Sequence, residues 1–182
     1  MRGPVWQGRR LASALVAVVV YAAGSWASPE TPAARSDRWR RVYVDNPAVA
    51  RALRSSLDGA GQRLEDAHCR SILSSPRLRD PSGRPLTDKL DALGMEPPEY
   101  LDVVVFLDGS AEPRCRAGAL AFTAPGARVV YVCGLRFWRA WTERPHHTEA
   151  AVIHEALHTL GLGEDPPSSQ FITQEVLAYC YR

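Results

Sequence analysis

The apolar residues that follow position 45 recur at the spacing of a helix. Asn46 is a typical helix cap and Pro47 a typical first helical residue. Apolar side chains then repeat every four residues, at Val49, Leu53 and Leu57. We expect this helix to end near the glycines at 59 and 61, whose backbone freedom disfavours a helix. Further short helices are expected over 64–73 and 87–94.

The middle of the chain has the pattern of β-strands. Residues 101–107 form a compact apolar run with three consecutive valines, which favours a buried strand over a helix. Residues 118–123 and 129–133 flank an Ala-Pro-Gly-Ala tetrapeptide, and a Pro-Gly pair suits a tight turn, so these segments predict a β-hairpin. Helical spacing returns over 135–141 and again near the C-terminus. The fold class expected is therefore α+β, a single domain with a small mixed sheet and N-terminal helices.

The first 27 residues have the organisation of a secretory signal peptide. Two arginines precede an apolar run over 11–24, and Ser25 and Ala27 occupy the small-residue positions of a cleavage site. We expect cleavage after Ala27. An uncleaved membrane anchor is the alternative, because about 17 apolar residues is the shortest length that spans a bilayer.

The rest of the chain divides into a linker or arm over 28–45 and one domain over 46–182. With 182 residues, 46% hydrophobic and 23% charged, the composition is that of a globular protein and excludes a disordered or collagen-like chain. The formal net charge is +2, and without the three arginines of the signal segment 19 basic residues face 20 acidic ones. This balance disfavours a nucleic-acid-binding protein, which needs a concentrated basic face. We expect a mature monomer, extracellular or periplasmic, that binds neither nucleic acid nor membrane.

The four cysteines fit an exported protein. None lies in a Cys-x-x-Cys pair, which disfavours a zinc knuckle or a thioredoxin-like site. In an oxidising compartment we expect two structural disulfides. Of the three possible pairings, we favour Cys115 with Cys133, on either side of one hairpin, and Cys69 with Cys180, which joins the middle of the chain to its end.

A compact set of chemically reactive residues lies near the C-terminal end of the chain. His154 and His158 are four residues apart in an apolar segment, with Thr148 available as a helix cap and Gly161 as a helix stop. On a helix, this spacing puts both imidazoles on one face, one turn apart, where both can bind one zinc ion. Glu155 lies about a third of a turn from His154 and can reach a water on the same ion. This is the geometry of a general base.

The pattern His154-Glu155-x-x-His158-x-x-Gly161-x-x-Glu164 resembles the long zinc-binding signature of metzincin-type metallopeptidases. In that family the glycine turns the chain back, so that the residue three positions later becomes the third ligand. This chain has Glu164 there instead of histidine, and no methionine follows the motif. The resemblance implies a small secreted zincin-like domain with an active-site helix. It also implies Zn²⁺ held by His154, His158 and Glu164, and a protein or peptide substrate.

Other residues can complete the site. Asp165, adjacent to Glu164, is a second candidate for the third ligand, and Glu175, on an expected last helix, is a third, in a layout similar to gluzincins. The strand over 129–133 is expected to pair with an extended substrate. Three tyrosines are candidate donors to the oxyanion of the reaction: Tyr131, Tyr179 and Tyr181.

The function expected is zinc-dependent hydrolysis of peptide bonds by a secreted enzyme. A zinc-activated water attacks the amide, and Glu155 serves first as base and then as acid. One alternative is a secreted, disulfide-bonded protein that binds zinc or a partner without peptidase activity. A structural zinc in such a protein is closed by four protein ligands. The other alternative is an envelope zincin tethered to the membrane by an uncleaved segment over 11–27.

Overall fold

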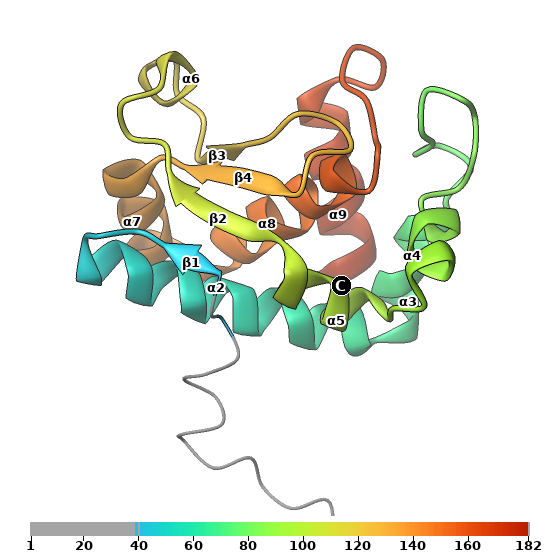
Figure 1. Ribbon diagram of the computed structural model, residues 1–182, viewed down its shortest axis with the longest axis horizontal. Helices are drawn as coiled ribbons and strands as arrows, with labels where there is room; N and C mark the ends of the chain where they lie inside the picture. The colour runs from blue at the N-terminus through green and yellow to red at the C-terminus, as the bar shows by residue number, and fades with distance from the viewer. Residues whose placement is uncertain (1–38, 40, 182) are drawn as a thin grey trace, which may run out of the picture. The chain divides into compact units, whose positions relative to one another are not determined.

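The computed structural model describes Trp39 and residues 41–181 (Figure 1). These residues belong to one compact unit. The expected signal peptide, 1–27, and most of the expected arm lie outside the described residues. No helix in the described part combines the length and the apolar character needed to cross a membrane.

The described residues contain eight α-helices and one short 3-10 helix, η1. The first five helices and η1 are α2 (Pro47–Glu65), α3 (Ala67–Arg70), η1 (Ser71–Ser74), α4 (Thr87–Leu93), α5 (Pro97–Val103) and α6 (Pro113–Arg116). The last three helices are α7 (Gly134–Glu143), α8 (Pro145–Thr159) and α9 (Ser169–Cys180).

The longest described helix, α2, begins as the sequence predicts. The Asn46 side chain accepts hydrogen bonds from the backbone N–H groups of Ala48 and Val49, at 3.0 and 3.3 Å. Its buried face packs against α5, α7 and α8. The expected stop at the glycines is wrong, because α2 continues through them. At Gly59, the Glu149 side chain of α8 lies 2.6 Å from where a Cβ atom would be, so the glycine permits a close approach of two helices.

In the described part of the chain, four short strands form one mixed sheet. They are β1 (Val42–Tyr43), β2 (Val105–Asp108), β3 (Ala121–Phe122) and β4 (Val129–Val132). Their order across the sheet is β1-β2-β4-β3, in which β1, β2 and β4 are parallel and β3 is antiparallel to β4. The predicted hairpin is confirmed as β3 and β4, and the fold is mixed α+β as expected. The sequence predicts an arm over 28–45. Residues 42–43 of that segment instead form strand β1 and are part of the sheet.

The strand expected over 101–107 is wrong in its first half. Residues 97–103 form α5, and only 105–108 form β2. Two prolines occupy the first turn of α5, where their missing N–H groups need no partner. The Glu99 side chain accepts a hydrogen bond from the backbone N–H of Glu96 at 3.1 Å. These N-terminal signals outweigh the β-branched character of the valines.

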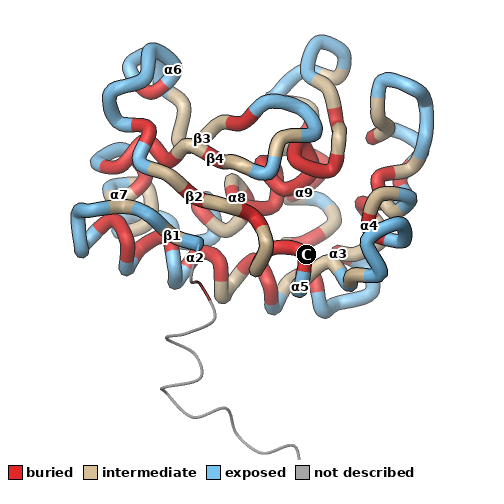
Figure 2. Tube along the Cα trace, in the orientation of Figure 1, coloured by how far each residue is buried: buried red, intermediate tan, exposed pale blue. Residues whose placement is uncertain are grey.

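Helix α8 lies in the interior, in contact with α2, α7, α9, β3 and β4. Ten of its 15 residues are buried, and its exposed residues, 145–147, all lie in the first turn. Figure 2 shows exposed residues concentrated on the outer loops and buried ones where α2, α8 and the sheet meet. The helix begins at Pro145, so Thr148 is not the cap that the sequence predicts. Its buried hydroxyl instead donates to the Pro145 carbonyl and accepts from the Ser56 hydroxyl, both at 2.7 Å.

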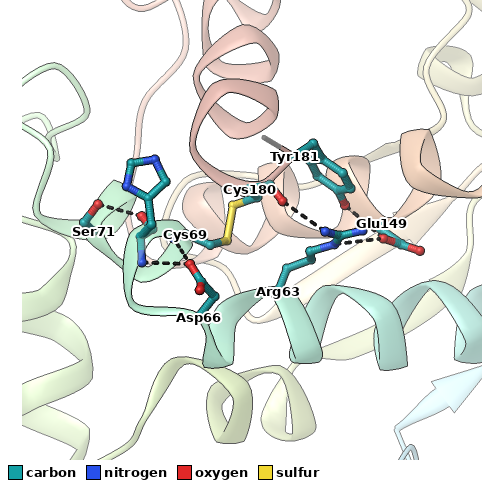
Figure 3. The surroundings of a disulfide bond; sticks show 8 residues. Arg63, Asp66, Cys69, Ser71, Glu149, Cys180 and Tyr181 are labelled. Atoms are coloured by element: carbon teal, nitrogen blue, oxygen red, sulfur yellow. Dashed lines mark hydrogen bonds and ion pairs between the residues drawn. A yellow bond between two sulfur atoms is a disulfide. The ribbon is translucent and has the colours of Figure 1, made fainter.

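Two disulfides cross-link the described residues in the pairing that the sequence favours. Cys69 of α3 is bonded to Cys180 at the end of α9 (Figure 3). Cys115 of α6 is bonded to Cys133, which immediately precedes α7. All four cysteines are therefore paired. The two bonds attach the last helix and the short helix α6 to the rest of the fold.

We predict that the Cys69–Cys180 bond contributes more to stability than the Cys115–Cys133 bond. The bonds span 111 and 18 residues, for which loop-closure entropy gives about 5 and about 3 kcal/mol. Urea unfolding of the two double Cys→Ser variants measures both losses in the free energy of unfolding. An equal or larger loss for the Cys115–Cys133 pair would contradict the prediction.

Candidate metal centre

Helix α8 brings His154 and His158 together on one face, as their spacing predicts. Both residues are buried, with 6% and 4% of their surface exposed. Their Nε2 atoms are 3.0 Å apart. A tetrahedral ion with bonds of about 2.0–2.1 Å to nitrogen separates two ligand atoms by about 3.3 Å. A shift of a few tenths of an ångström therefore adapts this pair to one ion.

The second nitrogen of each ring is held by a different neighbour. His158 Nδ1 lies 2.8 Å from the Leu162 carbonyl oxygen, which can only accept, so we assign the proton to Nδ1 and the lone pair to Nε2. His154 Nδ1 lies 3.0 Å from the Thr173 hydroxyl of α9. Burial, followed by the charge of His158, lowers the pKa of His154 to about 4. His154 is therefore oriented and neutral at neutral pH, the form that binds a metal ion.

The chain after α8 turns back and brings a carboxylate to the two imidazoles. The helix ends two residues before Gly161, whose φ of 116° is rarely adopted by residues with a side chain. The backbone N–H groups of Gly161 and Leu162 donate to carbonyls in the last helical turn, at 2.9 and 3.0 Å. One ligand atom each from His154, His158 and Glu164 lies within 4.8 Å of the other two. These three residues form a group that can hold a metal ion.

The other two candidate ligands do not join this group. Asp165 is exposed. Among the described residues, His154, His158 and Glu164 form the only grouping of His, Cys, Asp or Glu that could hold an ion, and Asp165 is not part of it. Glu175 is buried on α9, where its carboxylate accepts from Arg77 Nη1 at 2.8 Å. This ion pair links the loop before α4 to α9. Glu175 is therefore paired with Arg77 and is not part of the metal group. With three protein donors described, the group leaves room for a further, exchangeable ligand.

Glu155 is a buried carboxyl group with an unmet hydrogen bond. It is 7% exposed, and its Oε2 atom has no partner among the described residues. Burial, and then the negative charge of Glu164, raises the pKa of Glu155 to about 8, against the opposing effects of Arg114 and a backbone hydrogen bond from Thr123. A divalent cation held by the neighbouring histidines would favour the carboxylate form. The group is therefore placed to exchange a proton next to the candidate ion.

A cavity of about 270 Å³ adjoins the metal group. It is lined by the three candidate ligands, Glu155, β3 and the segment between α6 and β3. Among its lining residues, Arg114 is the one lysine or arginine. Sequence reasoning missed Arg114, because one arginine in an Arg-rich chain has no local signal. Its position depends on the Cys115–Cys133 disulfide, which attaches α6 to the residue after β4.

The three tyrosines proposed as oxyanion donors do not line this cavity. Tyr131 stacks on the ring of Phe122 in β3, with ring centroids 5.2 Å apart. Tyr179 stacks on His68 at 5.5 Å. Tyr181 donates its hydroxyl to Glu149 at 3.2 Å, in the polar network beside the Cys69–Cys180 disulfide (Figure 3). Burial raises the pKa of Tyr181, which keeps that phenol protonated. The expectation that one of them serves the site is therefore not supported.

A second, smaller cavity of about 210 Å³ adjoins His154 and Glu155 on the side of α9. Its walls are mostly apolar and small, and they come from the N-terminal half of α8, from α9 and from the segment that leads into β3. The apolar residues that line it are Ala119, Leu120, Ala121, Ala150, Ala151 and Leu177. An apolar side chain of moderate size fits such a space.

The strand that borders the site is β3 and not the strand over 129–133 that the sequence predicts. Strand β4 is paired on both sides, with β2 and with β3, so it cannot accept another chain. Strand β3 pairs only with β4 among the described strands, and both of its residues line the cavity. An extended peptide can therefore add to the sheet at β3. The prediction chose the wrong strand because the order of strands in a sheet cannot be read from local sequence patterns.

No family model, curated protein or solved structure matches this chain. The function is therefore inferred from the geometry and chemistry of the site.

We predict that Glu164, and not its neighbour, completes the metal group. Glu164→Gln removes a charged oxygen donor and should weaken binding of Zn²⁺ at least tenfold, whereas Asp165→Asn should leave it unchanged. Asparagine tolerates the positive φ of 59° at position 165, so the control preserves the loop. Competition with a chromogenic chelator measures both affinities. A larger loss in Asp165→Asn than in Glu164→Gln would assign the ligand to Asp165.

The hydrogen bond from Thr173 to His154 gives a second prediction. Thr173→Val keeps the shape of the side chain but removes the hydroxyl that orients the ring, and should lower the affinity for Zn²⁺ by about tenfold. Thr173→Ser retains a hydroxyl and should stay close to the parent protein. The same chelator competition measures both variants. An unchanged affinity in Thr173→Val would show that α8 alone orients His154.

Proposed function

We propose that this protein is a secreted, zinc-dependent peptidase. The observation that carries the proposal is the unpartnered, buried carboxyl of Glu155 beside an open group of two imidazoles and one carboxylate. Buried carboxyl groups with raised pKa values are typical of catalytic sites. A helix that serves only to fill the core has no need of three ionisable side chains.

Zn²⁺ is the ion that the donor set favours. Two histidine nitrogens and one carboxylate oxygen are a common catalytic zinc set, whereas Ca²⁺ and Mg²⁺ prefer oxygen donors alone. When bound, the ion would act as a Lewis acid on a carbonyl oxygen and lower the pKa of water. A structural zinc is usually closed by four protein ligands, so the three described donors favour catalysis over a purely structural role.

Glu155 is the residue that moves protons in the proposed reaction. Its Oε2 atom takes a proton from the water that attacks the peptide carbonyl carbon. The same carboxyl group then gives the proton to the leaving nitrogen, which departs as an amine when the C–N bond breaks. Its burial excludes bulk water as a competing proton acceptor.

The surroundings of the group suit a polypeptide substrate. An extended chain paired with β3 would lie beside the cavity that Glu155 lines. The apolar cavity beside His154 then receives one side chain of that peptide. Two disulfides support an oxidising compartment, which agrees with export.

The proposal predicts that Glu155→Gln abolishes hydrolysis and retains the metal. Glutamine has nearly the same shape but cannot accept the proton, so the rate should fall at least about 100-fold. The parent protein and the variant should each bind about one zinc per chain, measured by elemental analysis. Hydrolysis is measured on an unfolded protein by mass spectrometry.

Glu65→Gln is the matched control, because Glu65 is exposed at the end of α2, outside the cavity. One zinc per chain with no hydrolysis by the parent protein would favour the binding protein without peptidase activity. Absence of zinc under metal-replete conditions would remove the basis of the proposal.

A further inference from the structure

Arg114 lies at the metal cavity on a short helix that a covalent bond holds in place. It belongs to α6, and the next residue, Cys115, is bonded to Cys133 at the end of β4. The Arg114 carbonyl oxygen also accepts a hydrogen bond from the Ala119 backbone N–H at 3.3 Å. The backbone that carries Arg114 is thus tied to the same strand pair that borders the cavity.

The hydrogen-bond donors of the Arg114 guanidinium have no partner among the described residues. Its Cζ atom lies over the Phe122 ring, 5.5 Å from the ring centroid, which is within cation–π distance. No described residue forms a hydrogen bond or ion pair with its five N–H donors. Arg116, two residues later, is different, because its Nη1 atom donates to the Ala111 carbonyl at 2.7 Å and it does not line the cavity. Arg114 is exposed and lines the cavity, so its planar set of donors is available to a ligand there.

A bound ion would decide the charge balance of the cavity. With Glu155 and Glu164 ionised, a divalent ion held by the metal group would balance the two carboxylates, and Arg114 would then add one unit of positive charge. A site with net positive charge attracts anions and repels cations.

Positive charge continues beyond the cavity. Arg136 and Arg139 of α7 line a neighbouring cavity of about 530 Å³, and neither side chain has a hydrogen bond or ion pair with the described residues. One acidic side chain, Glu143, lines it as well, so one unit of positive charge remains there too. Leu120 borders both this cavity and the apolar one beside His154. The two cavities thus each carry arginine side chains that no described residue pairs with.

We propose that Arg114 binds a carboxylate of the substrate in the same cavity as the reacting bond, so that the protein prefers acidic peptides. This inference rests on the proposed function and names the substrate class of that site. A planar guanidinium pairs with a carboxylate through two parallel hydrogen bonds, which a neutral amide side chain cannot reproduce. The carboxylate belongs either to a glutamate or aspartate side chain or to the C-terminus of the peptide.

The test is a binding measurement on the full mature chain, loaded with Zn²⁺ and carrying Glu155→Gln so that no turnover occurs. The probes are fluorescent hexapeptides that contain one leucine for the apolar cavity. One set has a single glutamate at each position in turn and an amidated C-terminus. A second set replaces that glutamate by glutamine, and a third is the glutamine set with a free C-terminal carboxylate. Fluorescence anisotropy gives the dissociation constants.

We expect at least one glutamate or free-carboxylate peptide to bind about tenfold more tightly than its neutral counterpart. Arg114→Gln should reduce this ratio to about one, and Arg114→Lys should keep part of it, because it retains the charge but not the planar pair of donors. Arg116→Gln changes the net charge of the same helix by the same amount and should leave the ratio intact. Thermal unfolding of the variants shows whether α6 remains folded.

The outcomes separate this inference from the proposed function. Equal binding of acidic and neutral peptides, or a preference that survives in Arg114→Gln, would overturn the inference. If the protein with Glu155 restored cleaves neutral peptides as well as acidic ones, the peptidase function stands and the preference falls. If acidic peptides bind through Arg114 but none is cleaved, the carboxylate site stands and the peptidase function falls.

Discussion

The burial of α8 is the constraint on which the rest of the site depends. This helix carries two histidines and a glutamate into an interior where their polar atoms need partners from the protein or from a bound ligand. Thr173 and Leu162 satisfy one nitrogen of each imidazole, and the two Nε2 atoms are left facing each other at 3.0 Å. Oε2 of Glu155 has no described partner at all. A cation held between the imidazoles and Glu164 would supply the positive charge that this arrangement lacks.

The elements around α8 are held by covalent bonds as much as by the sheet. The four described strands have only two to four residues each, so the sheet contributes few hydrogen bonds. One disulfide fixes α9, which carries Thr173 toward His154, and the other fixes α6, which carries Arg114 toward the cavity. The two bonds thus stabilise the fold and also attach the elements that carry Thr173 and Arg114.

Local patterns predict the elements of this chain well where one signal dominates. The Pro-Gly turn between two short apolar segments predicts the hairpin, and the Asn46-Pro47 cap predicts the start of α2. They fail where two signals compete. At α5 the consecutive prolines and Glu99 favour a helix start more strongly than the following valines favour a strand. At Gly59 the glycine accommodates the side chain of Glu149 and does not end the helix, a fact that depends on a residue 90 positions away.

The sequence by itself determined the pair of histidines on one helix face and the adjacent Glu155. These features depend on the period of a helix, which acts over a few residues. Glu164 is one of three candidate third ligands, and the structure groups it with the histidines. Only the tertiary structure decided that Glu175 pairs with Arg77, that β3 and not β4 has an unpaired edge, and that Arg114 joins the cavity. Each of these depends on contacts between elements distant in the chain, and such contacts leave no periodic pattern in a single sequence.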